Sequence, residues 1–198
     1  LHWHSDIMKQ KVLLKFYRPL QNWLIKRADM IVGTTPVYVQ KSPALQQVQD
    51  KVDFIAIGIH GVKPDEEKVS WIRQQYAGKK IVYSLGRLVG YKGYEYLVDA
   101  AEELGDDYVI LIGGTGPLRE SLQQRIDSKG LSQKVKLLGY IPDEEAPNYF
   151  GACDVFCLSS IWKTEAFGLV QVEAMSCGKP VVATLIEGSG VSWVNLDG

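Results

Sequence analysis

The sequence lacks the features that mark several large classes of protein. No apolar run in its 198 residues approaches the roughly 18 residues that a membrane-spanning helix needs. Its three cysteines, Cys153, Cys157 and Cys177, form no C-x-x-C pair and lie among apolar residues. With 22 Lys and Arg residues against 23 Asp and Glu residues, it has no basic excess. We therefore expect no disulfide, buried thiols in a reducing compartment, and no nucleic-acid partner.

The composition is that of an ordinary globular protein, with 46% hydrophobic and 23% charged residues. It provides material for one domain, or for one domain and part of another. The chain opens with "LHWHSD", without an initiator Met or a signal peptide. We interpret it as a trimmed part of a cytosolic protein.

The first long pattern, in residues 6–28, has apolar side chains at helical spacing between lysines and arginines. It predicts a basic amphipathic helix over residues 9–27. Such a helix can cover a sheet with its apolar face, or rest on anionic lipid, where each cation contributes about 1 kcal/mol. We favour packing, because helices with one apolar face usually face a core. Short apolar runs follow at 30–33 and 52–57, and Thr35 before Pro36 predicts a helix start between them.

From Lys80 onward, strands and helices alternate. The strands are continuously apolar, as in parallel strands covered on both faces, and this predicts a Rossmann-like, doubly wound α/β domain. The expected strands are 80–86, 107–114, 135–141, 154–160 and 180–184, and the expected helices are 94–104, 117–130, 144–153 and 169–178. Because such sheets bind ligands at the carboxyl ends of their strands, the informative loops are 86–93, 113–117, 139–142 and 159–168.

Two of these loops combine glycines with an anion-binding pattern. Gly114 and Gly116 do not complete a G-x-G-x-x-G fingerprint, because Arg119 occupies the last position. A glycine turn before a helix start still suits an anion, although it can also be a tight turn without a ligand. Arg87 and Lys92 lie in the first glycine loop. They could hold a diphosphate, or be ordinary surface charges.

The stretch 164–184 holds two carboxylates eight positions apart, Glu165 and Glu173. Residues 166–169 are expected to form the first turn of a helix whose unpaired N–H groups face an anion. Glu165 would then project into the cleft, and Glu173 could accept hydrogen bonds from two ribose hydroxyls. The alternative is that Glu165 meets the helix dipole and Glu173 is merely solvated.

Four segments, taken together, resemble a known family. "GRLVGYKGYEYLVDAA", "LIGGTGPLRESL", "KVKLLGYIPDEE" and "SSIWKTEAFGLVQVEAMSCGKPVVATLIEGSGVSWVNLDG" are similar to successive blocks of the carboxyl-terminal domain of group 1 glycosyltransferases, the GT4-type retaining enzymes of GT-B fold. "EAFGLVQVE" fits that family's E-x7-E motif. The resemblance implies that residues 1–51 end an amino-terminal acceptor domain with its linker. Residues 52–198 would then be an incomplete nucleotide-sugar domain.

The resemblance also implies roles for single residues. Arg87 and Lys92 would grip the donor diphosphate, Glu173 would bind the ribose, and Glu165 would contact the transferred sugar. Tyr140 and Ile141 would lie near the base. The full set of implied donor-binding residues is Gly86, Gly114, Gly116, Tyr140, Ile141, Phe167, Gly168, Leu169 and Glu173.

The opening "LHWHSD" resembles the last inner strand of the amino-terminal domain, where the family has a His near the transferred sugar. His4 fits that position better than His2. The two histidines alternate on one strand face and could form a metal pair, but no third ligand is visible. A buried structural histidine is the alternative. With no D-x-D pair either, we expect no metal and no cofactor besides the nucleotide-diphosphate sugar.

The resemblance implies a retaining glycosyltransferase that moves a hexose from a UDP- or GDP-linked sugar to a glycan or lipid-linked acceptor. We expect a cytoplasmic enzyme of bacterial surface polysaccharide synthesis, with peripheral membrane contact through residues 9–27 as a further expectation. The 198 residues alone should bind donor without efficient turnover, because most of the family's acceptor domain is absent. Two alternatives are a sugar-nucleotide epimerase, which needs no acceptor, and a non-catalytic nucleotide-binding domain.

Overall fold

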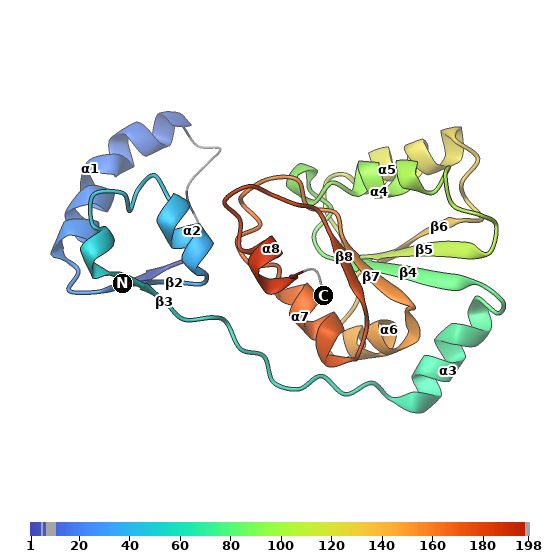
Figure 1. Ribbon diagram of the computed structural model, residues 1–198. Coiled ribbons are helices and arrows are strands. Elements are labelled where there is room, and N and C mark those ends of the chain that lie inside the picture. Colours follow the sequence, from blue (N-terminus) through green and yellow to red (C-terminus); the bar gives the residue numbers. More distant parts are fainter. Residues whose placement is uncertain (5, 7–10, 197–198) are drawn as a thin grey trace. The chain divides into compact units, whose positions relative to one another are not determined.

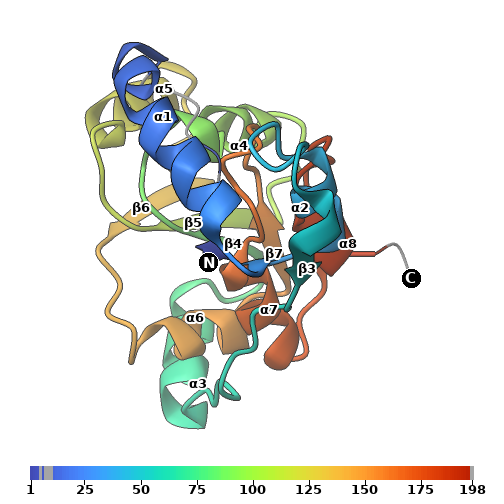
Figure 2. The same cartoon turned by 90° about the vertical axis from the view of Figure 1, so that its left-hand side faces the viewer.

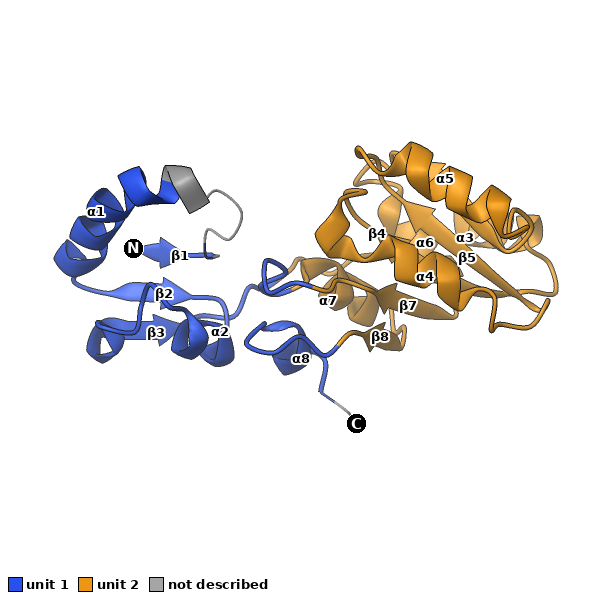
Figure 3. Cartoon of the chain, turned by 90° about the horizontal axis from the view of Figure 1, so that it is seen from above, with its two compact units in different colours: residues 1–58, 162–167, 185–198 blue, residues 59–161, 168–184 orange. Residues whose placement is uncertain are grey.

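The computed structural model describes residues 1–4, 6 and 11–196. The chain divides into two compact units, shown in different colours in Figure 3. The first unit comprises residues 1–58, 162–167 and 185–198, and the second comprises residues 59–161 and 168–184. Within the described part of the chain, no helix combines the length and apolar character needed to cross a membrane.

The first unit contains a small parallel sheet of order β1-β2-β3. Thr35 is the predicted helix cap, and its hydroxyl accepts a hydrogen bond from the Tyr38 backbone N–H at 3.2 Å. The elements, coloured blue to cyan and red in Figure 1, are β1 (His2–Trp3), α1 (Lys11–Arg27), β2 (Ile31–Gly33), α2 (Pro36–Lys41), η1 (Gln49–Lys51), β3 (Val52–Phe54) and α8 (Val191–Val194). Their core consists of Trp3, Ile25, Ile31, Tyr38, Val39, Leu45 and Val48.

Helix α1 packs with only part of its apolar surface. Ile25 is 2% exposed and lies in the core, which agrees with the packing role. Phe16 is 80% exposed, however, and Leu20 and Trp23 are each 57% exposed. Some apolar residues of α1 therefore pack in the core, and others are exposed on the surface of the helix.

The second unit is a doubly wound α/β fold, as predicted. Its five strands are all parallel, in the order β6-β5-β4-β7-β8, so the order reverses beside β4. Helices α4 and α5 pack together on one face of the sheet, and α3 and α6 pack together on the other (Figures 1 and 2). The strands are β4 (Lys80–Leu85), β5 (Tyr108–Gly113), β6 (Val135–Gly139), β7 (Val155–Leu158) and β8 (Val181–Ala183). The helices are α3 (Glu66–Gln75), η2 (Gly90–Lys92), α4 (Tyr94–Ala100), α5 (Arg119–Ser128), α6 (Ala146–Ala152) and α7 (Leu169–Ser176).

The two faces of this sheet have different cores. On the α4 and α5 side, aliphatic residues such as Leu97, Ile112 and Ile126 are almost completely buried. On the other side lies an aromatic cluster in which the Tyr83 ring is 5.5 Å from both Tyr149 and Phe150. Both faces are thus covered, which explains why the strands are apolar at consecutive positions.

Several helices differ from the sequence predictions, and α7 and α3 are two of them. Helix α7 begins at Leu169 and not at residue 166, because Gly168 has φ +71, a left-handed conformation that cannot belong to a right-handed helix. Helix α3 was not predicted at all. Asp65 caps this helix, since its carboxylate accepts hydrogen bonds from the N–H groups of Glu67 and Lys68 at 2.9 and 3.2 Å. Asp is a preferred capping residue, so the sequence did contain a signal for the start of α3.

Candidate functional site

Backbone hydrogen bonds join three of the predicted loops at the carboxyl ends of β4, β5 and β6. The Gly86 N–H donates to the Gly113 carbonyl at 3.0 Å, and the Leu88 N–H donates to the Thr115 carbonyl at 2.9 Å. The Gly114 N–H donates to the Gly139 carbonyl at 2.6 Å. The loops at 86–93, 113–117 and 139–142 therefore lie side by side beside the point where the strand order reverses, where such sheets bind ligands.

Two glycines allow these loops to approach so closely. Gly114 has φ +129, and a Cβ there would lie 1.9 Å from the Gly86 carbonyl oxygen. Gly116 has φ +158, and a Cβ there would lie 2.5 Å from the Leu88 carbonyl oxygen. No side chain fits into either contact. The packing of one loop on the other is therefore sufficient to explain why both positions are glycine.

A lysine side chain lies over the first glycine loop. Lys92 is only 9% exposed, and its Nζ would lie 3.3 Å from a Cβ added at Gly86. The same ammonium lies 5.6 Å from the centre of the Tyr91 ring. Arg87, from the same loop, is exposed. The structure therefore brings both predicted cations to the end of β4, at the edge where a ligand would enter.

Sequence reasoning did not single out one further cation of this edge. Arg119 begins α5, and its Nη1 lies 3.7 Å from the position of a Cβ on Gly139, at the end of β6. The signal was present, since Arg119 is the residue that breaks the glycine fingerprint. Tyr140 and Ile141 follow Gly139, and their side chains differ: Tyr140 is 71% exposed, whereas Ile141 is buried.

The first residues of the loop at 159–168 contact the loop at 86–93. The Ser159 hydroxyl donates to the Lys92 carbonyl at 2.8 Å, and the Ile161 N–H donates to the Tyr91 carbonyl at 2.8 Å. A Cβ on Gly93 would lie 2.2 Å from the Ser159 carbonyl oxygen. These contacts fix the turn that carries Lys92, because its backbone is bonded to the end of β7.

Helix α7 supplies the remaining predicted residues of the second unit. Its cap, Gly168, provides no side-chain hydrogen bond to the first N–H groups, and Leu169 is the first helical residue. Glu173 is half-buried one turn further on. Its pKa is raised, first by burial and then by the negative charge of Asp143. This carboxylate could accept hydrogen bonds from hydroxyl groups, which would also stabilise its charged form.

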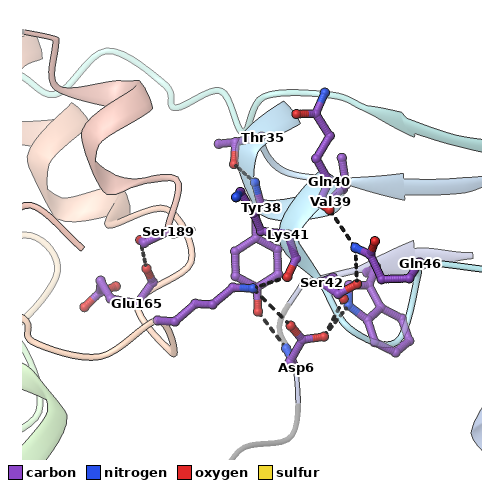
Figure 4. Close-up of polar contacts among 12 residues, drawn as sticks. Asp6, Thr35, Tyr38, Val39, Gln40, Lys41, Ser42, Gln46, Glu165 and Ser189 are labelled. Atoms are coloured by element: carbon purple, nitrogen blue, oxygen red, sulfur yellow. Dashed lines mark hydrogen bonds and ion pairs between the residues drawn. The ribbon is translucent and has the colours of Figure 1, made fainter. Parts of the chain in front are cut away.

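Three predicted residues belong to the first unit. Glu165 and Phe167 are buried, and the Glu165 carbonyl accepts a hydrogen bond from the Ser189 hydroxyl (Figure 4). His4 is exposed, and its ring centroid is 4.1 Å from that of His2. In residues 1–4, 6 and 11–196, no three or more His, Cys, Asp or Glu side chains form a group that could hold a metal ion.

The three cysteines are free. Burial raises the pKa of Cys153 to about 12 and that of Cys157 to about 11. Both thiols are therefore protonated at neutral pH and unsuited to act as nucleophiles.

Comparison with known proteins identifies relatives over nearly the whole chain. Residues 65–194 match the family model described as "Glycosyl transferases group 1". The chain is 35% identical to O-antigen chain mannosyltransferase C of Escherichia coli, over 98% of this chain and 52% of that protein. It is 33% identical to the D-rhamnosyltransferase WbpZ of Pseudomonas aeruginosa, over 99% of this chain and 51% of that protein. The chain thus spans about half the length of the curated relatives it matches.

Solved structures show the same relationship. The crystal structure of the Anabaena protein HepE in complex with UDP and glucose matches with a TM-score of 0.77 and 28% identity. The match covers 95% of this chain and 53% of that protein. A glycosyltransferase from Rickettsia africae shares the fold, with a TM-score of 0.77 and 20% identity.

Proposed function

The chain belongs to the group 1 glycosyltransferases, and from that premise we propose that it forms the donor site of a retaining, metal-independent hexosyltransferase. The donor would be a UDP- or GDP-linked sugar, and the acceptor a glycan or lipid-linked glycan of a bacterial surface polysaccharide. The observation that carries the proposal is the edge at the ends of β4, β5 and β6, where Lys92, Arg87 and glycine backbone lie together.

The chemistry of this edge suits a nucleoside diphosphate. Arg87 would hold two phosphate oxygens with its planar guanidinium, and Lys92 would add a second positive charge over the Gly86 backbone. The uncapped first turn of α7 would direct the N–H groups after Gly168 toward the same anion. Glu173 would accept hydrogen bonds from the two ribose hydroxyls. Tyr140 and Ile141 would flank the base.

During transfer, the bond between the anomeric carbon and the diphosphate oxygen breaks, and negative charge develops on the departing nucleotide. Arg87 and Lys92 would stabilise that charge, because they are in place before the reaction begins. The acceptor oxygen would bond to the anomeric carbon on the same face, and its proton would pass to a diphosphate oxygen. Glu165 would contact the sugar, and His4 would lie near it.

Relatives support the substrate class. One is named as an O-antigen mannosyltransferase and another as a D-rhamnosyltransferase, and HepE was solved with UDP and glucose. We propose mannose or a related hexose as the transferred sugar and the cytoplasm as the compartment. The natural full-length protein, incubated with UDP- and GDP-sugars and a lipid-linked glycan, should extend the acceptor with retention at the anomeric carbon, as read by NMR. Release of an epimer or of free sugar without any acceptor would contradict the proposal.

Helix α1 supports peripheral contact with the cytoplasmic face of a membrane. It contains Lys and Arg but no Asp or Glu, and Phe16, Leu20 and Trp23 are exposed along it. Such residues insert into the lipid interface, and cations near them favour anionic headgroups. The full-length protein should sediment with phosphatidylglycerol vesicles and less with phosphatidylcholine vesicles. Equal sedimentation of a Phe16→Ser, Trp23→Ser variant would contradict this role of α1.

A further inference from the structure

A lysine just before Glu165 is enclosed by other parts of the first unit. Lys163 Nζ donates a hydrogen bond to the Lys41 carbonyl at 2.7 Å and lies 3.6 Å from Asp6 Oδ2. It also lies 5.1 Å from the centre of the Tyr38 ring. Figure 4 labels these three partners, Lys41, Asp6 and Tyr38. A backbone oxygen, a carboxylate and an aromatic face thus fix the ammonium of Lys163.

The carboxylate that faces Lys163 is itself held firmly. Asp6 is only 9% exposed, and its Oδ1 accepts hydrogen bonds from the Ser42 hydroxyl at 2.6 Å and the Trp3 indole N–H at 3.3 Å. Its backbone N–H donates to the Tyr38 hydroxyl at 2.7 Å. Burial raises the pKa of Tyr38 to about 12, so that hydroxyl remains neutral. A buried carboxylate is costly without a counter-charge, and Lys163 provides one.

The turn that follows Lys163 is fastened on its other side. The Glu165 N–H donates to the Trp162 carbonyl at 2.9 Å, and the Glu165 carbonyl accepts from the Ser189 hydroxyl. The Ala166 carbonyl accepts from the Gly190 N–H at 2.9 Å. These bonds fix the backbone of Glu165 against residues 189–190, and Lys163 fixes the preceding turn against residues 6 and 41.

We propose that Lys163 is a positioning residue for sugar transfer, which acts by holding the turn that orients Glu165. The inference rests on the proposed function, in which Glu165 contacts the transferred sugar. Loss of the ammonium would free the start of the 162–167 turn while the bonds to Ser189 and Gly190 remain. A displacement of the order of 1 Å at a reacting centre can lower a rate about 100-fold, even when the altered residue does not touch substrate.

The test compares K163M, K163R and D6N with a matched control in the natural full-length protein. The control is K51M, since Lys51 Nζ donates to two backbone carbonyls of the same unit, those of Lys26 and Ala28, both at 2.7 Å. Initial rates at varied donor concentration separate kcat from the donor KM. We expect K163M and D6N to lower kcat about 10- to 100-fold with little change in KM. K163R should recover most of the loss, and K51M should match the wild type.

A second comparison asks whether Lys163 acts through Glu165. In an E165Q background, K163M should cause no further loss, because the group that it orients is already gone. Wild-type kcat in K163M, or an equal additional loss in the E165Q background, would overturn the inference. If K163M does not fold, D6N carries the same test, because Asn keeps the shape and removes the charge. A wild type without transfer activity would refute the proposed function itself, whereas an active wild type with a fully active K163M refutes only the positioning role.

Discussion

The two ends of the sheet in the second unit are held together by different means. At the carboxyl end, loops pack backbone against backbone through Gly114 and Gly116. At the amino end, charged side chains do the joining. Arg73 makes two hydrogen bonds to Asp154 at 2.9 and 2.8 Å, and the Asp154 carboxylate also accepts from the Ile81 N–H at 2.7 Å. The loops at the carboxyl end are thus joined mainly through their backbones, whereas the amino end is joined through the side chains of Arg73 and Asp154.

The largest effect should follow Gly114→Ala. The added Cβ would lie 1.9 Å from the Gly86 carbonyl oxygen, and φ +129 is unfavourable for any L residue. We expect the free energy of unfolding to fall by about 3 kcal/mol or more, and nucleotide binding to disappear. Urea unfolding and calorimetric titration measure the two effects.

Gly130→Ala is the matched control for that substitution. Gly130 also has a positive φ, +66, but a Cβ there would meet nothing within 4 Å. Its cost should be about 1 kcal/mol, from backbone strain alone. Equal costs for the two variants would show that the approach of the two loops does not matter for stability.

The next largest effect is expected on the affinity for nucleotide. Arg87→Ala and Lys92→Met should each weaken UDP or GDP binding about 10- to 100-fold, since a hydrogen bond to a charged group contributes about 1.5 to 3 kcal/mol. Arg73→Met removes a cation at the opposite end of the sheet, and it should bind nucleotide like the wild type. Weakened binding in Arg73→Met as well would mean that general charge, and not the edge, attracts the nucleotide.

Arg73→Met should instead reduce stability, by about 1 kcal/mol at neutral pH. Burial alone would raise the pKa of Asp154, but hydrogen bonds from Arg73 and the Ile81 N–H outweigh it and lower the pKa below 3.8. A carboxyl group whose pKa is lower in the folded than in the unfolded chain stabilises the fold at pH values above the unfolded pKa. That stabilisation is lost as the pH falls through the folded pKa. The stability difference between wild type and variant, measured by urea unfolding at each pH, should therefore be constant from pH 7 to about pH 5 and shrink as the pH falls through about 3.8 toward the lower folded pKa. A difference in the free energy of unfolding that does not change with pH would mean that Arg73→Met lowers stability through lost packing and not through lost charge.

The smallest effect on stability is expected from Glu173→Gln. Burial, with the charge of Asp143, raises the pKa of Glu173 above 4.5. A carboxyl group whose pKa is higher in the folded than in the unfolded chain favours the fold at pH values below the unfolded pKa. That advantage is lost as the pH rises through the folded pKa. The Gln variant should match the wild type near pH 4 and melt slightly higher at pH 7.

The same variant tests the ribose contact. Wild type should bind UDP or GDP more tightly than the 2′-deoxy form, and Glu173→Gln should lose about 10-fold in affinity together with that preference. An unchanged preference would remove Glu173 from the ribose contact.

The sequence predicted the second unit well because its signals are local. Each of its strands is a short apolar run, and β4, β5 and β6 end at or beside a glycine. In the first unit, Thr35 caps its helix through the backbone N–H of Tyr38, three residues away, which is an equally local signal. The start of α7 was misjudged, because Gly168 has a left-handed backbone conformation, and a Cβ there would lie 2.6 Å from Leu158 Cδ2, neither of which spacing reveals. The link between Lys163 and Asp6 was unpredictable for the same reason. Its partners lie far apart in the chain, and no local spacing connects them.

The first measurement of the donor site is calorimetric titration of this chain with UDP and with GDP in EDTA. We expect one nucleotide to bind without metal, with affinity about 10- to 100-fold lower in Arg87→Ala and in Lys92→Met and unchanged in Arg73→Met. No binding by a chain that unfolds cooperatively, or wild-type affinity in both Arg87→Ala and Lys92→Met, would contradict a donor site at the ends of β4, β5 and β6.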